Sequence, residues 1–326
     1  MPTSLISLGS NLGDRKATLQ SAVDALAGTP GVKVVVVSSL YGTKPIGGPA
    51  GQAEFLNAAV RIETLLEARE LLARLQAIEA AAGRTRDRRW GPRTLDCDLL
   101  LHGPAVLDEP DLSVPHPRMA YRRFVLEPAA EVAGDLVHPT VGWTIARLLD
   151  HLNAARPYVA VAGLDAGQRW LVASALARQW HARLIAAADL LSADELLAAG
   201  DCSGSAPAYR VKFLDRLAEP LAVSRWASGP VVGDFWLDQL LVSALASGQA
   251  EQVCALRTAL AAIESQVVGP KLLVVLAEPP VRADHPPWRE LKRLASRRGR
   301  GPVAWVPSDD LDLAVTEAAA AIGAMG

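Results

Sequence analysis

The stretch RWGPRTLDCDLLL, at residues 89–101, holds the most specific pattern in this chain of 326 residues. Leu95–Leu101 is apolar apart from its acids and Cys97, so it predicts a core β-strand. Because side chains alternate along a strand, Asp96 and Asp98 leave one face and Cys97 leaves the other. Two carboxylates on one face repel each other, so a cation is expected beside them. Mg²⁺ suits this place because it binds one or two carboxylates together with phosphate oxygens.

A solvent-facing polar stripe paired with arginines is the alternative for these two acids taken alone. Arginines do crowd the segment before them: Arg84, Arg86, Arg88, Arg89 and Arg93. Guanidinium groups this dense repel one another unless an anion lies among them, and their fork fits phosphate oxygens. A solvated charged loop would have the same composition. Arginines directly before paired acids nevertheless favour a nucleoside triphosphate site.

Two aromatic residues and an amide suggest where a second substrate binds. Phe55 and Asn57 lie two residues apart in a predicted strand, Phe55–Glu63, and therefore share a face. Phe124 follows Arg122 much later in the chain. Each ring alone is more typical of a hydrophobic core. An aromatic face beside an amide, however, suits a flat heterocycle that is both stacked and hydrogen-bonded.

The elements around these residues predict an α+β domain. Four strands are expected, over Thr3–Leu8, Lys33–Tyr41, Phe55–Glu63 and Leu95–Leu101. Two helices are expected, from the N-cap Asp14 to Gly28 and over Glu67–Ala82. The glycine- and proline-rich segment Thr43–Gln52 is expected to be a loop, and two short helices should follow Pro128. The order β-α-β-β-α-β is the ferredoxin-like pattern, a sheet with two helices on one face.

A second domain is predicted after a linker at 153–157. Strands expected at Tyr158–Ala162, Val231–Gly233, Leu272–Leu276 and Val303–Val306 alternate with helices, which indicates a doubly wound parallel sheet. We therefore divide the chain into domains over 1–152 and 157–326. The turn after the first of these strands has the layout of a phosphate-binding P-loop, but Gln168, Arg169 and Trp170 replace its glycine, lysine and hydroxyl residue.

Composition sets limits on partners and compartment. The net charge of −2 gives no overall attraction to nucleic acid or to an anionic membrane. Three widely spaced cysteines predict neither a disulfide framework nor a zinc site. The N-terminus lacks the pattern of a signal peptide, and no apolar run is long enough for a membrane span. A cytoplasmic protein is expected, with no nucleic-acid or membrane partner.

Four motifs in the first half resemble one family of enzymes. SLGSNLG at 7–13, FLNAAV at 55–60, RWGPRTLDCD at 89–98 and VPHPRM at 114–119 occur in the same order in the 6-hydroxymethyl-7,8-dihydropterin pyrophosphokinases. The resemblance covers about residues 1–152. It implies transfer of diphosphate from ATP to the pterin with release of AMP, a step of folate biosynthesis. The only departure noted is Cys97, where the family usually has an aliphatic residue.

The resemblance also implies roles for individual residues. Two Mg²⁺ ions would bind Asp96 and Asp98, which with Arg84 and Arg93 would form the catalytic set. ATP would be bound by Glu79, Arg84, Arg86, Trp90, Arg93, His116 and Arg122. The pterin would lie between Phe55 and Phe124, and its edge would be read by Asn57 and the loop residues Thr43, Pro45, Ile46 and Gly47.

The second half resembles a deoxynucleoside kinase-like domain whose catalytic residues are missing. Phe235 stands where such kinases have an arginine after the aspartate Asp234. We expect this domain to be non-catalytic, with a homo-oligomer through it left open. Two alternatives are a bifunctional enzyme with a working C-terminal kinase, and a non-catalytic nucleotide-binding regulator. The intact acids and arginines of the first half weigh against the regulator.

Overall fold

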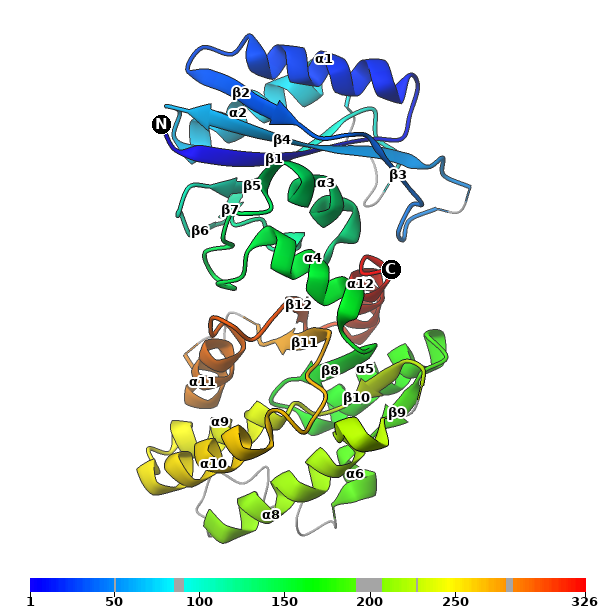
Figure 1. Cartoon of the computed structure of the whole chain (residues 1–326). Coiled ribbons are helices and arrows are strands. Elements are labelled where there is room, and N and C mark those ends of the chain that lie inside the picture. Colours follow the sequence, from blue (N-terminus) through cyan, green and yellow to red (C-terminus); the bar gives the residue numbers. More distant parts are fainter. Residues whose placement is uncertain (50, 85–90, 192–206, 227, 280–283) are drawn as a thin grey trace. The chain divides into compact units, whose positions relative to one another are not determined.

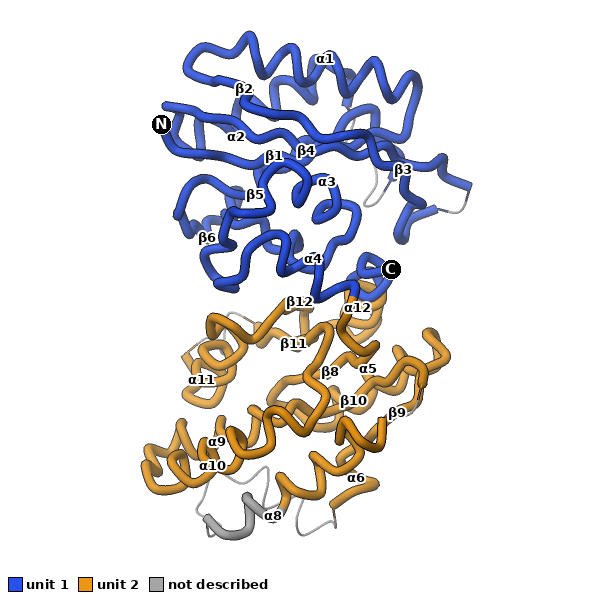
Figure 2. The backbone as a smooth tube through the Cα atoms, viewed as in Figure 1, with its two compact units in different colours: residues 1–153, 320–326 blue, residues 154–319 orange. Residues whose placement is uncertain are grey.

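A computed structural model describes residues 1–49, 51–84, 91–191, 207–226, 228–279 and 284–326 (Figure 1). The chain separates into two compact units (Figure 2). Unit 1 comprises Met1–Asn153 and Ala320–Gly326, and unit 2 comprises Ala154–Ala319. The boundary after Ala319 lies inside the helix Leu311–Gly323 and was not predicted.

Unit 1 is built on an antiparallel sheet of five strands. Its order is β2-β4-β1-β5, and β3 pairs with β4. The strands are β1 (Thr3–Ser10), β2 (Val32–Val37), β3 (Tyr41–Thr43), β4 (Phe55–Thr64) and β5 (Asp96–His102). A separate hairpin, β6 (Leu107–Glu109) and β7 (Leu112–Val114), leads to the 3₁₀ turn η1 (Met119–Tyr121).

Helices cover both faces of this sheet (Figure 1). One face packs against α1 (Arg15–Ala27) and α2 (Ala68–Ala81), and the other packs against α3 (Arg123–Ala133). The helix α4 (Ile145–Ala154) completes the first segment of the unit. The expectation of helices on one face only was therefore incomplete, because α3 lies opposite the first two.

Local sequence explains where the first two helices begin. The Asp14 carboxylate accepts a hydrogen bond from the Ala17 N–H at 3.0 Å, which caps α1. Glu67 and Glu70 form a reciprocal capping box at the start of α2. Between these helices and the sheet lies a fully buried core that includes Ile6, Leu8, Leu19, Leu71 and Leu75.

The strand predicted over Lys33–Tyr41 is interrupted. The register shifts between Val34 and Val36, so the strand bulges, and β2 ends at Val37. Ser38 then uses its hydroxyl oxygen, in place of a backbone carbonyl, to accept the Ala59 N–H at 2.9 Å. The short strand β3 starts at Tyr41 and takes in Thr43, which was expected in the loop.

The helices expected after Pro128 begin earlier. α3 starts at Arg123 and contains Pro128 inside it. A proline lacks the N–H that would bond four residues back, but five other α3 residues pack in the core and hold the helix. Glu131 fixes α3 to the sheet by accepting hydrogen bonds from the Ser39 N–H at 3.0 Å and the Tyr41 hydroxyl at 2.9 Å.

Unit 2 is a parallel sheet of five strands in the order β12-β11-β8-β10-β9. These are β8 (Tyr158–Ala162), β9 (Arg183–Ile185), β10 (Val231–Gly233), β11 (Leu272–Ala277) and β12 (Val303–Pro307). Its helices are α5 (Ala166–Gln179), α6 (Ala187–Leu190), α8 (Pro207–Ala218), α9 (Leu240–Ala246), α10 (Ala250–Ile263), α11 (Pro286–Ala295) and α12 (Leu311–Gly323), with 3₁₀ turns η2 (Glu219–Leu221), η3 (Val223–Arg225) and η4 (Leu237–Gln239). Of these, α12 ends in unit 1.

Two local features of unit 2 differ from expectation. The helix expected from about Trp170 begins at Ala166, because the Asp165 carboxylate caps it by accepting the Gln168 N–H at 2.9 Å. The strand β9 was not predicted, since three residues are too few to show a period.

Among the described residues, no helix has both the length and the apolar character to cross a membrane.

Candidate functional site

A row of residues from neighbouring strands forms the centre of the candidate site. Gly9 of β1 pairs with Asn57 of β4 on one side and with Asp96 of β5 on the other. A Cβ atom at Gly9 would lie 3.3 Å from Asn57 Oδ1, 3.9 Å from Asp96 Cβ and 4.0 Å from Phe55 Cδ1. A side chain at Gly9 would therefore press on Asn57, and glycine lets Asn57, Phe55 and Asp96 lie close together on neighbouring strands.

This row lies on the face of the sheet opposite α1 and α2. Cys97 and Leu99, which alternate with the acids, are buried against those helices. Asp96 and Asp98 project to the α3 side, as the alternation predicted. Sequence reasoning gave Gly9 no role, although a glycine inside a strand often marks close approach of a ligand.

Asp96 is held between two arginines. Arg93 donates to its Oδ2, and Arg84 Nη2 lies 2.8 Å from its Oδ1. The Arg84 contact is an ion pair without hydrogen-bond geometry, and the buried Oδ1 accepts no hydrogen bond from the described residues. Burial and the neighbouring Asp98 carboxylate raise the pKa of Asp96, and Arg93 and Arg84 oppose this shift.

Glu79 reaches this group from behind the sheet. Its side chain is 4 % exposed, and Oε1 accepts the Cys97 N–H at 2.8 Å and a hydrogen bond from Arg84 Nη1. Glu79 therefore connects α2, the backbone of β5 and Arg84. The resemblance implies that Glu79 contacts ATP, and in the structure its carboxylate bonds to Arg84, another residue of the expected ATP site.

Asn11 holds the backbone of Arg93 in place. Its Oδ1 accepts the Arg93 N–H at 2.7 Å, and its own N–H donates to the Arg93 carbonyl at 3.1 Å. Asn11 is 2 % exposed. The sequence analysis assigned it no role, and the only signal was its place in the turn-forming run after β1.

His116 lies beside Asp98. Its Nε2 is 3.8 Å from Asp98 Oδ2, and its Nδ1 accepts the Arg118 N–H at 3.2 Å. Burial, with Arg122 and Arg118 nearby, lowers the pKa of His116 to about 3. The imidazole is therefore neutral near pH 7, and because Nδ1 is an acceptor, its proton is assigned to Nε2.

The loop predicted to read a heterocycle edge meets the amide of the site. Asn57 Nδ2 donates to Thr43 Oγ1 at 2.8 Å, and Thr43 pairs with Phe55 across β3 and β4. After Pro45 and Ile46, Gly47 adopts φ +71°, which favours glycine. These contacts place Thr43 and Asn57 together, as predicted.

The second predicted aromatic residue has a different neighbour. The Arg122 guanidinium lies over the Phe124 ring at 5.5 Å from its centroid. This is a cation–π contact, so Arg122 occupies a ring face that a stacked ligand would use. The predicted residues Arg86 and Trp90, with Arg88 and Arg89, lie outside the described residues.

Within the described residues, no group of three or more His, Cys, Asp and Glu side chains could hold a metal ion. A metal at this site would be bound by two carboxylates and its substrate, which is the usual situation for Mg²⁺. The buried Asp96 carboxylate, with Asp98 beside it, fits that role.

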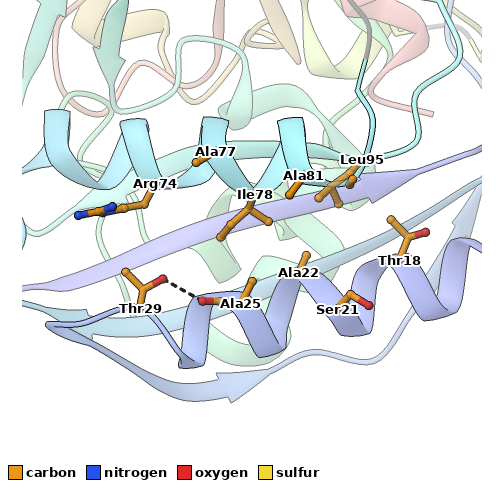
Figure 3. Close-up of a pocket in the computed structure, with 11 residues that line it drawn as sticks. Thr18, Ser21, Ala22, Ala25, Thr29, Arg74, Ala77, Ile78, Ala81 and Leu95 are labelled. Atoms are coloured by element: carbon orange, nitrogen blue, oxygen red, sulfur yellow. Dashed lines mark hydrogen bonds between the residues drawn. The ribbon is translucent and has the colours of Figure 1, made fainter.

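A surface groove between α1 and α2 is a different place. It has a volume of about 480 Å³, with Ala22, Ala25, Ala77 and Ile78 along it and Arg74 at one end (Figure 3). Its hydroxyl groups on Thr18 and Thr29 donate to backbone carbonyls of their own helix. The groove lies on the α1 and α2 face of the sheet, opposite the face that carries Asp96 and Asn57.

Taken together, unit 1 presents a ring, an amide and two acids among arginines, the set of groups expected in a pyrophosphokinase of the class that the four motifs resemble. Residues 5–134 match the family described as 7,8-dihydro-6-hydroxymethylpterin-pyrophosphokinase (HPPK). The chain belongs to this family, and the resemblance seen in the four motifs is confirmed.

Several relatives carry the name 2-amino-4-hydroxy-6-hydroxymethyldihydropteridine pyrophosphokinase. One from Pseudomonas aeruginosa is 46% identical over 153 residues, which cover 47% of this chain and 91% of the relative. One from Bacillus subtilis is 51% identical over 127 residues, or 39% of this chain and 75% of the relative. A solved HPPK-DHPS from Plasmodium falciparum aligns over 87% of this chain and 73% of its own, at 11% identity and a TM-score of 0.36, which is too distant to carry an argument.

Proposed function

We propose that unit 1 transfers diphosphate from ATP to 6-hydroxymethyl-7,8-dihydropterin and releases AMP, a step of folate biosynthesis. The observation that carries this proposal is the row Asn57–Gly9–Asp96, in which a residue proposed for the heterocycle and a residue proposed for the metal lie on either side of one glycine. Family membership over residues 5–134 supports it.

Asp96 and Asp98 would hold Mg²⁺, and we propose two ions with ATP. When bound, Mg²⁺ neutralises phosphate charge in such reactions. Arg84 and Arg93 would bind the phosphate oxygens that build up charge during transfer, because both guanidinium groups already converge on Asp96. Neutral His116 would donate its Nε2 proton in a hydrogen bond to a phosphate oxygen, and Arg122, with the predicted Arg86 and Trp90, would complete the ATP site.

The pterin would stack on Phe55 and Phe124 and present its edge to Asn57 and to the loop residues Thr43, Pro45, Ile46 and Gly47. A stacked ring on Phe124 requires Arg122 to leave the face that it covers, which would free this guanidinium for ATP. The hydroxymethyl oxygen would then attack the β-phosphorus in line, with AMP leaving. Positioning and charge neutralisation account for most catalysis in such transfers.

The direct test is AMP formation from ATP by the full chain, with and without 6-hydroxymethyl-7,8-dihydropterin, and with the pterin product identified by mass spectrometry. We expect AMP and pterin diphosphate in equal amounts, and only when the pterin and Mg²⁺ are both present. Release of ADP, or no dependence on the pterin, would refute the assignment.

We propose that unit 2 is a deoxynucleoside kinase-like domain without catalysis. Its first strand β8 is central and chain crossovers go to both sides, so a ligand would be expected at its carboxyl end. There Arg169 donates to the Gly163 carbonyl at 2.6 Å and to the Asp234 carbonyl at 2.9 Å. An arginine side chain thus takes the place where a P-loop would present N–H groups to phosphate.

Strand order supports the finer fold assignments. In unit 1 the antiparallel order β2-β4-β1-β5, with helices α1 and α2 on one face, fits a ferredoxin-like core extended by α3. In unit 2 the order fits a doubly wound P-loop-like sheet.

A further inference from the structure

The last residues of the chain, Ala320–Gly326, belong to unit 1, although unit 2 separates them from the rest of it in sequence. The Arg123 N–H donates to the Ala324 carbonyl at 2.7 Å, and Arg123 Nε donates to the Met325 carbonyl at 3.1 Å. Ala324 is 4 % exposed and Met325 is 2 % exposed. The segment is therefore packed and bonded as an integral part of the unit.

The bonded position is significant because Arg123 is the first residue of α3. The first N–H groups of a helix have no partner within it, and a buried N–H without a partner destabilises the helix end. The Ala324 carbonyl supplies that partner. The next residue, Phe124, carries one of the two rings proposed to stack on the pterin.

A second contact reaches the other proposed pterin element. A Cβ atom at Gly323 would lie 3.3 Å from Ile46 Cγ2. The backbone of the segment thus lies against the loop that follows Thr43, and a side chain at position 323 would press on Ile46. This contact is independent of the Arg123 hydrogen bonds.

Two residues proposed to bind ATP, Arg122 and Arg93, are held by backbone hydrogen bonds elsewhere in unit 1. The Arg122 N–H donates to the Met119 carbonyl at 3.3 Å in η1, and Arg93 is held by Asn11. Neither bond involves Ala320–Gly326. Loss of the segment should therefore act on one substrate more than on the other.

We propose that Ala320–Gly326 is a positioning segment for the pterin subsite, which holds Phe124 through the α3 cap and holds Ile46 through Gly323. This inference rests on the proposed function of unit 1. The segment touches no reacting group, so it acts on pterin affinity through Phe124 and the loop.

The test is deletion of residues 324–326 from the full chain, followed by steady-state kinetics with each substrate varied. We expect the KM for the pterin to rise about tenfold, since two hydrogen bonds are lost. The KM for ATP should change less than about twofold. In amide hydrogen exchange, the Arg123 N–H should lose protection.

Point variants give the same test without deletion. Gly323→Leu places a side chain against Ile46 and should raise the pterin KM, whereas Met325→Leu keeps the carbonyl and the apolar volume and should not. Asn153→Ala is the matched control, because Asn153 Oδ1 accepts another Arg123 bond at 2.7 Å that does not involve the segment. We expect Asn153→Ala to leave the pterin KM unchanged.

Equal rises in both KM values, or an unchanged pterin KM in the deletion variant, would overturn the inference. If the deletion prevents folding, the folded Gly323→Leu variant provides the test. An unchanged KM for the pterin in that variant would also overturn the inference. Absence of AMP formation by the wild-type chain would instead refute the proposed function. Unchanged exchange at the Arg123 N–H after deletion would refute this inference alone.

Discussion

Asp96 is the residue on which the arrangement of the site depends. The Arg84 and Arg93 guanidinium groups converge on it. Glu79 orients the Arg84 side chain, and Asn11 holds the Arg93 backbone. These two guanidinium groups balance the charge of a carboxylate that is largely buried.

Asp96→Asn should lower turnover at least about a hundredfold, because it removes negative charge at the proposed metal site and breaks the ion pairs of Asp96 with Arg84 and Arg93. Activity should be measured across Mg²⁺ concentrations, with melting temperature as the check on folding. Asp111→Asn is the matched control, since Asp111 pairs with Arg69 at the surface. Near-normal turnover in Asp96→Asn would exclude the metal assignment.

Phe55→Ala and Phe124→Ala should weaken pterin binding by about 1–3 kcal/mol each, by analogy with base–aromatic stacking. ATP binding should change less. Calorimetry with each ligand measures both effects. Phe55→Ala is the cleaner variant, because Phe124 also contacts Arg122, which is proposed to bind ATP. Equal losses for both ligands would show that the rings serve only the core.

At the scale of elements, the turn before α4 contains a buried histidine that links stability to pH. His138 is 5 % exposed, and its Nδ1 accepts the Val141 N–H at 3.3 Å. Burial lowers the pKa of His138 from 6.5 to about 4. The unfolded chain therefore binds a proton more readily than the folded one, and the turn loses stability as pH falls from about 6.5 to about 4.

Between pH 7 and pH 4.5 we expect His138 to cost unit 1 about 2 kcal/mol of unfolding free energy. His138→Asn should reduce this loss, because an asparagine Oδ1 can still accept the Val141 N–H without titrating. Urea unfolding at both pH values measures this loss of unfolding free energy. The transition of unit 1 is the one that shifts when ATP is added. His181→Asn, at an exposed position with φ 51°, is the control. Identical pH slopes in His138→Asn and wild type would contradict the expectation.

At the scale of the whole chain, we expect catalysis from unit 1, with its antiparallel sheet, and none from unit 2, with its parallel sheet. Unit 1 has its acids and arginines assembled, whereas in unit 2 the Arg169 side chain lies among backbone carbonyls at the end of β8. Gln239 adds to Arg169 there, since its Nε2 donates to the Gly163 carbonyl at 2.8 Å. Asp165 places a carboxylate at the start of α5, where a phosphate would bind.

The full chain should therefore not phosphorylate deoxynucleosides. The test uses the Asp96→Asn chain, in which the activity proposed for unit 1 should be lost. It measures the transfer of phosphate from labelled ATP to a panel of deoxynucleosides. Arg169→Lys alone should not restore transfer, because Gln168 and Trp170 still lack the roles of glycine and hydroxyl residue in a P-loop. Clear turnover by the Asp96→Asn chain would support the bifunctional alternative instead.

The sequence by itself determined the features that depend on neighbouring residues. Alternation along β5 put Asp96 and Asp98 on one face, capping residues set the starts of α1 and α2, and four motifs established the family. These features are encoded within a few residues, so they can be read directly.

Only the tertiary structure decided which distant residues meet. Strand register placed Gly9 between Asn57 and Asp96, and packing of α2 behind the sheet brought Glu79 to Arg84. The assignment of Ala320–Gly326 to unit 1 and the insertion of Arg169 among carbonyls likewise have no local signal. Such contacts join residues far apart in the chain, and their geometry follows from sheet register and core packing rather than from local conformational preference.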